Sequence, residues 1–302
     1  MERLLQSCRI QNQLVRQCLA EFLGLYIAVV SLIGSGAAAQ VITSQGTHGS
    51  YLTMQLGSAL GAVTHDVCFL SGAQLNVVWS MSLWILGRQP WRKVPLYALS
   101  HLLGAFLGAA TVYLQYYDAI QMFSGGQLSV AGPNAIAGIF CSYPADHLSV
   151  WGGIMDQVVA TALLLICCLA VEDRRQGLLP DGLAPVLVGA LILTIGLSMG
   201  SNCGFPLNPA RDLGPWLFTF IAGWGEEVFK AGGGWWWVPI VAPFVGGLLG
   251  TRAAHSSTSY SSKFTISTRH RFLKPETFYW VITVISLPPV LEAREETSLA
   301  IL

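Results

Sequence analysis

Charged side chains are scarce in this chain. Asp, Glu, Lys and Arg make up 11% of its 302 residues, whereas a soluble globular domain carries about 25%. Hydrophobic residues make up 53%, and the mean hydropathy is +0.55. A soluble protein of this length needs more charge to cover its surface, so the composition predicts an integral membrane protein.

The chain also lacks a charge imbalance and any catalytic or metal-binding motif. Its 16 basic and 16 acidic residues cancel, which argues against a nucleic-acid partner. Its seven Cys show no CxxC or Cys/His ligand spacing, so we interpret Cys68, Cys167 and Cys168, which lie in apolar runs, as small buried hydrophobes. No nucleophile motif, metal cluster or phosphate loop supports an enzyme, and no cofactor or metal is expected.

Apolar runs are abundant, and six of them are long. A spanning helix needs about 20 apolar residues, so the first four are long enough and the fifth suffices with a little of its flank. The sixth has 16 residues and reaches only about 24 Å if it ends at Gly250. The six runs are Cys18–Ile42, Tyr51–Leu70, Val94–Tyr117, Val150–Val171, Leu183–Met199 and Trp235–Gly250.

Two further apolar stretches, Asn76–Leu86 and Asn208–Ile221, are about half as long as a span. They suit re-entrant half-helices better than crossings. We therefore predict an all-α integral membrane fold with six transmembrane helices and two half-helices.

The distribution of Lys and Arg predicts the orientation. They gather in the N-terminus, in the loops at 87–93 and 172–181, and in the tail after Gly250, whereas residues 43–50 and 118–150 contain none. Because cytoplasmic loops carry the excess of Lys and Arg, both termini are expected to be cytoplasmic. We expect the plasma membrane as the location.

An even number of spans with this orientation gives two halves of opposite topology, an inverted repeat. The half repeats are predicted at 16–117 and 150–250, after a cytoplasmic N-terminus at 1–15. The tail, 251–302, is expected to be disordered or atypical. Its 13-residue apolar stretch at 278–290 is too short to span a bilayer.

A short motif that occurs twice carries the functional prediction. Gly72-Ala73-Gln74-Leu75-Asn76 lies in the first half, and Gly204-Phe205-Pro206-Leu207-Asn208 lies in the second and continues with Pro209-Ala210. Asn is a favoured N-cap and Pro is favoured at the first helical position, so Asn208 should begin a helix. Interrupted apolar segments in corresponding halves are typical of a membrane pore or transporter site.

If the two loops enter from opposite faces, Asn76 and Asn208 meet at the midplane. Their side-chain N–H groups and the loop carbonyls would then suit water and polyols, and the positive helix ends would oppose protons and cations. Asn-Pro-Ala alone is an ordinary helix start. The second copy and the adjacent Arg211 favour the functional interpretation.

Arg211 directly follows the second motif. An ionisable side chain among apolar segments is by default a functional-site hypothesis, and a guanidinium keeps its charge and its donors. The alternative is a snorkelling surface Arg. Asp212 could pair with a residue elsewhere or shape the loop.

These residues resemble the major intrinsic protein family and, within it, the aquaglyceroporin branch. The first helix at 16–24 and the loop at 199–215 are similar to the family's signature segments, and Asp212 and the long stretch 118–150 are typical of the glycerol-conducting branch. Residues 222–225 and 235–239 also look aquaglyceroporin-like.

The resemblance implies a passive channel for water and small neutral solutes, chiefly glycerol, that assembles as a homotetramer. It implies a narrow filter formed by Arg211, Phe205, Gly196 and either Gly57 or Ser58. It further implies that Glu21 and Asp156 are buried acids that hold the re-entrant loops.

Several positions depart from the family pattern. Val77-Val78 stands where Pro-Ala is usual, and the larger Val78 is expected to overpack the site at a cost of about 1–3 kcal/mol. Gln74 replaces the usual His, Trp216 replaces an expected Arg, and His65-Asp66 lies deep in the second run. These features leave a non-conducting family member as the alternative function. A secondary transporter is a third hypothesis, which the scarcity of intramembrane charge disfavours.

Overall fold

A computed structural model describes residues 10–27, 33–68, 74–173, 180 and 182–265 of the chain. The chain divides into two compact units, residues 1–257 and 258–302. Of the second unit only residues 258–265 are described, as helix. The side chains of His65 and Asp66 lie outside the described residues.

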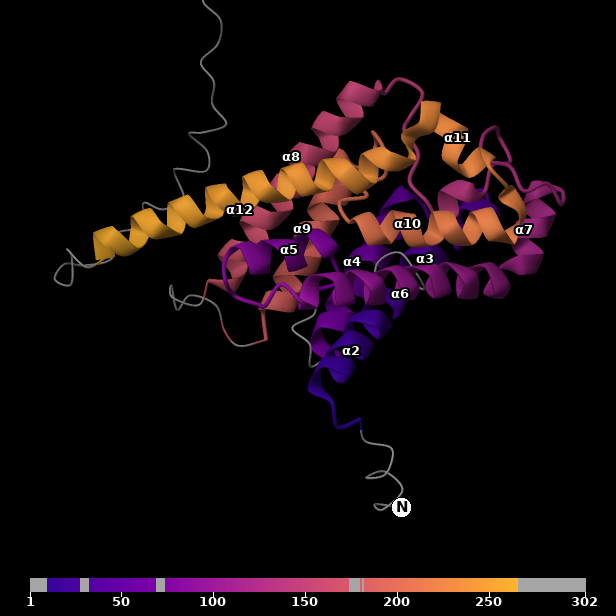
Figure 1. Cartoon of the computed structure of the whole chain (residues 1–302). Coiled ribbons are helices and arrows are strands. Elements are labelled where there is room, and N and C mark those ends of the chain that lie inside the picture. The colour runs from indigo at the N-terminus through magenta and orange to yellow at the C-terminus, as the bar shows by residue number, and fades with distance from the viewer. Residues whose placement is uncertain (1–9, 28–32, 69–73, 174–179, 181, 266–302) are drawn as a thin grey trace, which may run out of the picture. The chain divides into compact units, whose positions relative to one another are not determined.

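The described residues form helices and no strand, which confirms the all-α prediction (Figure 1). Short turns of 3-10 or π helix connect some of the α-helices. The elements are α2 (Gln13–Ile27), α3 (Ile33–Thr43), α4 (Tyr51–Cys68), α5 (Val77–Ile85), α6 (Lys93–Gln115), α7 (Tyr117–Ser124), η1 (Ala137–Ile139), α8 (Val150–Glu172), α9 (Ala184–Met199), α10 (Pro209–Thr219), η3 (Phe220–Trp224), α11 (Glu227–Gly234), η4 (Trp235–Trp237) and α12 (Val238–Thr265).

Three stretches of described helix are long and apolar enough to cross a bilayer. They are Lys93–Gln115, Val150–Glu172 and Glu227–Ser256, and the apolar Ala184–Met199 is shorter. Two short helices, α5 and α10, begin directly after Asn76 and Asn208, where the half-helices were predicted. The full count of six spans remains a prediction.

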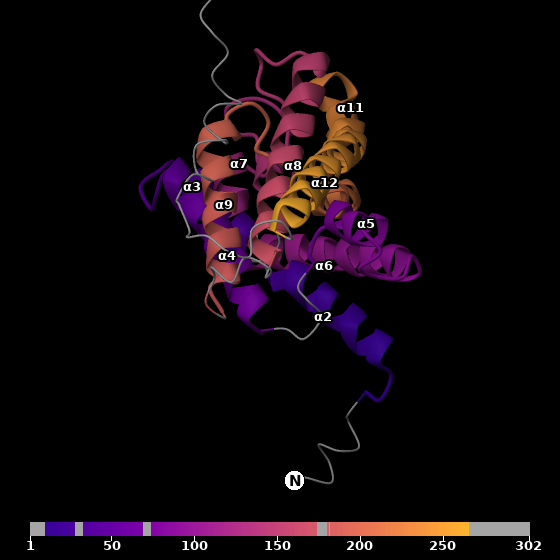
Figure 2. The same cartoon turned by 90° about the vertical axis from the view of Figure 1, so that its left-hand side faces the viewer.

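The helices of the first unit pack in two groups, and each group joins helices from both halves of the sequence. In the first group, α6 packs against both α2 and α10 (Figure 1). In the second, α9 packs against α4 and α8 (Figure 2). The short helix α10 from the second half therefore lies on a long helix of the first half, which brings the two repeated motifs together.

Glycines allow the closest helix contacts, and they do so in matching places. A Cβ at Gly104 of α6 would collide with the Phe22 carbonyl oxygen of α2. A Cβ at Gly246 of α12 would collide in the same way with the Val158 carbonyl oxygen of α8. In the second half Gly250 also lies against α8, at the Ala162 carbonyl. The correspondence between Gly104 and Gly246 supports an internal repeat, because in each half a glycine seats the last long helix against the first.

The sixth apolar run does not end where expected. We expected the helix to stop at Gly250, but α12 continues to Thr265. Thr251 and Ala254 are both buried, and the Thr251 hydroxyl donates to Ser82 Oγ at 2.8 Å. Residues three apart lie on one helix face, so this pair continues the packed side of α12 past Gly250. The expectation of a short sixth helix was therefore wrong.

Candidate functional site

Asn76 and Asn208 begin the two short helices in the same way. Both have extended backbone, with φ −137° and ψ 125° at Asn76 and φ −139° and ψ 110° at Asn208. Each Oδ1 accepts from the backbone N–H two residues on, at 2.9 Å from Val78 and 3.2 Å from Ala210. Val77 thus fills the first helical position that Pro209 fills in the other copy, and the cap forms without proline.

The two asparagines are joined by crossed hydrogen bonds. Asn76 Nδ2 donates to the Leu207 carbonyl at 3.0 Å, and Asn208 Nδ2 donates to the Leu75 carbonyl at 2.6 Å. Each side chain therefore contacts the residue that precedes the other asparagine. An amide has two N–H groups, so each asparagine retains a second donor beyond this crossed pair.

The residues before each asparagine have left-handed backbone. Leu75 has φ 52°, Leu207 has φ 55° and Phe205 has φ 45°. Non-glycine residues with positive φ are uncommon, cost about 1–3 kcal/mol each and cluster at functional sites. The matching conformations at Leu75 and Leu207 place their carbonyls where the crossed bonds need them.

Glu21 holds the first loop from a buried position. Its two oxygens accept from the backbone N–H groups of Gln74 at 3.1 Å and Leu75 at 2.9 Å. His101 Nε2 lies 2.7 Å from Glu21 Oε2, and both side chains are fully buried. The predicted role of Glu21 thus has a direct geometric basis, and His101 is a hydrogen-bonded helix residue.

The second loop is held by Gln157 rather than by Asp156 alone. Gln157 is fully buried, and its Oε1 accepts from the Leu207 N–H at 3.0 Å, as Glu21 accepts from Leu75. Asp156 is only half-buried and contacts the side chains of Asn202 at 2.7 Å and Cys203 at 3.3 Å. We expected Asp156 to be a buried acid that holds the loop, but Asp156 contacts loop side chains, and the adjacent Gln157, which is buried, accepts from the loop backbone.

Arg211 and Asp212 form an ion pair at the start of α10. Arg211 Nη1 donates to Asp212 Oδ1. The Arg211 side chain is 18% exposed, whereas Asp212 is fully buried. Arg211 therefore keeps part of its guanidinium accessible while its charge is balanced inside the protein.

Gly196 lies beside Phe205, as the predicted filter requires, but the space at Gly196 is filled. A Cβ there would collide with Gln55 Oε1 and would lie 3.0 Å from Phe205 Cζ. The Tyr51 hydroxyl also donates to the Gly196 carbonyl at 2.8 Å. We predicted either Gly57 or Ser58 here, but the nearest side-chain atoms from α4 belong to Gln55, and Tyr51 makes the hydrogen bond.

The phase of α4 explains why Gly57 does not reach Gly196. Gln55, Ala59 and Val63, spaced four residues apart, form the side of α4 that meets α9. A Cβ at Gly196 of α9 would meet Gln55, and a Cβ at Gly189 would meet the Ala59 carbonyl and the Val63 side chain. Gly57 lies about 200° around the helix from Gln55 and so faces elsewhere. Gln55 Oε1 is buried and has no hydrogen-bond partner within the described part of the chain.

A cavity of about 590 Å³ is lined by both asparagines and by Arg211. Its walls come from both loops and from the helices α2, α4, α5, α8, α9 and α10. The lining residues are Leu25, Ala62, Gln74, Leu75, Asn76, Trp79, Leu164, Leu165, Cys168, Val171, Glu172, Gly182, Ala184, Pro185, Val188, Ile192, Phe205, Pro206, Leu207, Asn208 and Arg211. The cavity is mostly apolar, with polar atoms concentrated at the loops and at Glu172.

The departure at Val77-Val78 is accommodated by the packing. Val78 is fully buried, and a Cβ at Gly247 of α12 would collide with its Cγ1. At the corresponding contact of the second copy, Ala210 packs in one cluster with Ala105 of α6. The larger Val78 therefore meets a residue without a side chain, so the overpacking that we expected is absent.

Sequence reasoning missed a polar network around Gln74. Gln74 Oε1 accepts from Ser80 Oγ at 2.6 Å, and Gln74 Nε2 donates to Gln89 Oε1 at 2.9 Å. Gln89 in turn donates to the Ser80 carbonyl. The polar Gln74 side chain in the cavity wall is thereby fixed. Among the described residues no group of His, Cys, Asp and Glu could hold a metal ion.

Comparisons with known proteins show what this chain is similar to. The family model described as Major intrinsic protein matches residues 9–253. Human aquaporin-10 is 53% identical over 246 residues, covering 80% of this chain and 81% of that protein. Human aquaporin-9 is 44% identical over 247 residues, covering 81% and 83%. Among solved structures, the aquaglyceroporin from Plasmodium falciparum is 31% identical with a TM-score of 0.70, covering 80% of this chain and 95% of that chain.

Proposed function

The chain belongs to the major intrinsic protein family, and on that premise we infer that it is a passive membrane channel for water and small neutral solutes such as glycerol. Members of this family are channels and not enzymes. The observation that carries the inference for this chain is the crossed pair of Asn76 and Asn208 in the wall of one cavity.

We propose that solutes pass between the two asparagines. Each retains one amide N–H that can donate to a water or hydroxyl oxygen, and loop carbonyls accept the solute's own hydrogens. The two short helices direct their N-termini at this point, and these positive ends oppose cations and protons. Irregular backbone within a membrane is tolerated where it lines such a water-filled path.

We propose that Arg211 and Phe205 form the solute filter together with the polar pair from α4. Arg211 donates to hydroxyl oxygens, and the Phe205 ring offers an apolar wall to a carbon backbone. Gln55 Oε1, which lies at the edge of Gly196 near Phe205, adds an acceptor on that side. Gly196 then serves to admit Gln55 and Phe205 rather than to widen the pore.

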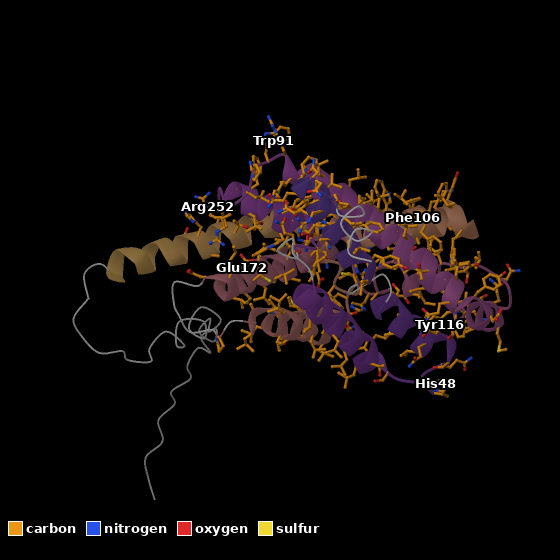
Figure 3. All side chains as sticks on the ribbon, turned by 90° about the horizontal axis from the view of Figure 1, so that it is seen from below. His48, Trp91, Phe106, Tyr116, Glu172 and Arg252 are labelled. Atoms are coloured by element: carbon orange, nitrogen blue, oxygen red, sulfur yellow. The ribbon has the colours of Figure 1, made fainter. Side chains whose placement is uncertain are left out.

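We propose a plasma-membrane location with both termini cytoplasmic. Figure 3 places Trp91, Glu172 and Arg252 toward one end of the helices and Tyr116 and His48 toward the other. The Arg88–Glu172 ion pair, at 3.4 Å, lies at the first of these ends. Because basic residues gather there, the positive-inside rule supports a cytoplasmic assignment for that end.

We also propose the family's homotetramer and the inverted half repeats at 16–117 and 150–250. The paired glycines Gly104 and Gly246 support the repeat. The described helix does not end at Gly250, so we extend the channel part to Ser257, where the first compact unit ends.

Permeability measurements test the proposed function. The purified full chain in liposomes should raise water and glycerol permeability above that of empty vesicles, measured by stopped-flow light scattering. A fully inserted chain that conducts neither would establish the non-conducting alternative.

A further inference from the structure

The orientation of Arg211 depends on a buried carboxylate. Asp212 is fully buried, and one of its oxygens, Oδ1, accepts from Arg211 Nη1. The guanidinium has five N–H donors, and a bond to Asp212 decides which of them remain for a solute. The position of Asp212 therefore sets what Arg211 can offer.

The second oxygen of Asp212 is held by a residue from a distant part of the chain. Ser142 Oγ donates to Asp212 Oδ2. Ser142 lies in the segment that joins η1 to α8, and it is 5% exposed. Each oxygen of the buried carboxylate thus has its own donor, one from Arg211 and one from Ser142.

The segment that carries Ser142 is fastened to the second loop and α10 at several points. The Ala145 N–H donates to the Asn202 carbonyl at 2.8 Å, and Trp216 Nε1 donates to the Tyr143 hydroxyl at 3.3 Å. Cys141 Sγ lies 3.7 Å from Thr219 Oγ1. These contacts hold the segment beside α10, and within it the Ser142 hydroxyl makes its own bond to Asp212.

We propose that Ser142 is a positioning residue of the solute filter, which acts on Arg211 through Asp212. The proposal rests on the proposed channel function. Without the hydroxyl, Asp212 Oδ2 stays buried and can find a donor only in Arg211. The guanidinium then turns further toward Asp212 and offers fewer N–H groups to a solute. A polyol needs several donors at once, so glycerol passage should suffer more than water passage.

Ser142→Ala tests the proposal in liposomes that contain the full chain. The ratio of glycerol to water permeability should fall about tenfold, the size expected for one lost hydrogen bond to a charged group. Ser142→Thr keeps a hydroxyl and should retain the wild-type ratio. Ser142→Val has the shape of threonine without the hydroxyl and should fall like Ser142→Ala, so the Thr/Val pair carries the test if the alanine variant does not assemble.

Tyr143→Phe is the matched control. It removes the contact with Trp216, but the Ala145–Asn202 and Cys141–Thr219 contacts still hold the segment and the Ser142–Asp212 bond stays. The permeability ratio should therefore stay within about twofold of wild type. A Ser142→Ala ratio equal to that of wild type, or an equal fall in Tyr143→Phe, would overturn the positioning role. A wild-type chain that conducts nothing would instead overturn the channel function on which this proposal rests.

Discussion

The two halves of the chain support their loops with different side chains. Glu21 holds the first loop, and Gln157 holds the second. Glu21 is a buried carboxylate with two backbone donors and a histidine beside it. Gln157 is a neutral amide that accepts one backbone N–H, with Asp156 beside it at the loop's side chains. Both arrangements give the same left-handed leucine and the same crossed asparagine. The same loop geometry is therefore reached with a charged acceptor in the first half and a neutral acceptor in the second.

A second contrast concerns the helix start after each asparagine. The second copy has Pro209-Ala210 packed near Ala105, and the first has Val77-Val78 packed against Gly247. The volume added on the half-helix is removed on the long helix. The larger Val78 in the first motif is thus accommodated by Gly247 of α12.

Removing the charge of Glu21 is expected to have the largest effect on folding stability. Glu21→Gln replaces one acceptor oxygen by an NH₂ group, which would face the N–H groups of the first loop and His101. We expect a loss of about 3 kcal/mol of folding stability, because a loop N–H loses its carboxylate acceptor and stays buried without a partner, together with loss of glycerol permeability. Thermal unfolding in detergent and liposome assays measure both. Unchanged stability would show that the first loop, like the second, needs only a neutral acceptor.

The compensation between Val78 and Gly247 gives the next largest effect. Gly247→Ala should destabilise the protein by about 1–3 kcal/mol, because the new methyl collides with Val78. Adding Val78→Ala recreates the pairing of Ala210 with Ala105 and should restore most of the loss. Thermal unfolding of the two single variants and the double variant measures the coupling. Additive effects would contradict the compensation.

Variants of Gln157 and Asp156 compare two kinds of support for the second loop. Gln157 accepts from the loop backbone, and Asp156 accepts from a loop side chain. Gln157→Leu leaves the Leu207 N–H buried without its acceptor and should cost about 1–3 kcal/mol. Asp156→Asn keeps an acceptor for Asn202 on a half-buried side chain and should cost less than about 1 kcal/mol. Unfolding midpoints show which variant is less stable. A larger loss in Asp156→Asn than in Gln157→Leu would show that Asp156 is the main support of the second loop.

Cys141, which directly precedes Ser142, gives the smallest effect on stability, and this effect is seen only at alkaline pH. Burial, and then the nearby Asp212, raises the pKa of the Cys141 thiol well above its ordinary value. An unfolded thiol ionises near pH 8.5, so the stabilisation from this raised pKa is present below that pH and is lost as the pH rises above it. Between pH 8 and 10 the wild type should lose more thermal stability than Cys141→Ala, whereas at pH 7 this pH-dependent difference should be absent. Equal slopes for the two proteins would contradict the assignment.

Much of the architecture could be predicted from the sequence because it depends on local patterns. The family resemblance is confirmed, and the half-helices start at Asn76 and Asn208 because capping is a property of the residue itself. The roles of Gln157, Gln55 and Gly247 could not be predicted. They depend on helix phase and on contacts between distant segments, and a shift of one or two residues along a helix changes the face that a side chain occupies.

The same reason explains the error at the sixth helix. The polar run after Gly250 reads as a terminus, yet Thr251 and Ala254 lie on the packed face of a continuing helix. A hydropathy pattern does not record that such residues have partners on α5.

The most direct test of this account compares the wild type with Val77→Pro/Val78→Ala, which restores the family motif in the first half. Both purified chains are inserted in liposomes at equal density, and glycerol permeability is measured by light scattering. Because Gly247 already accommodates Val78, the account predicts that the wild type conducts and that the double variant improves on it by no more than about twofold. A wild type indistinguishable from empty liposomes, beside a conducting double variant, would contradict it.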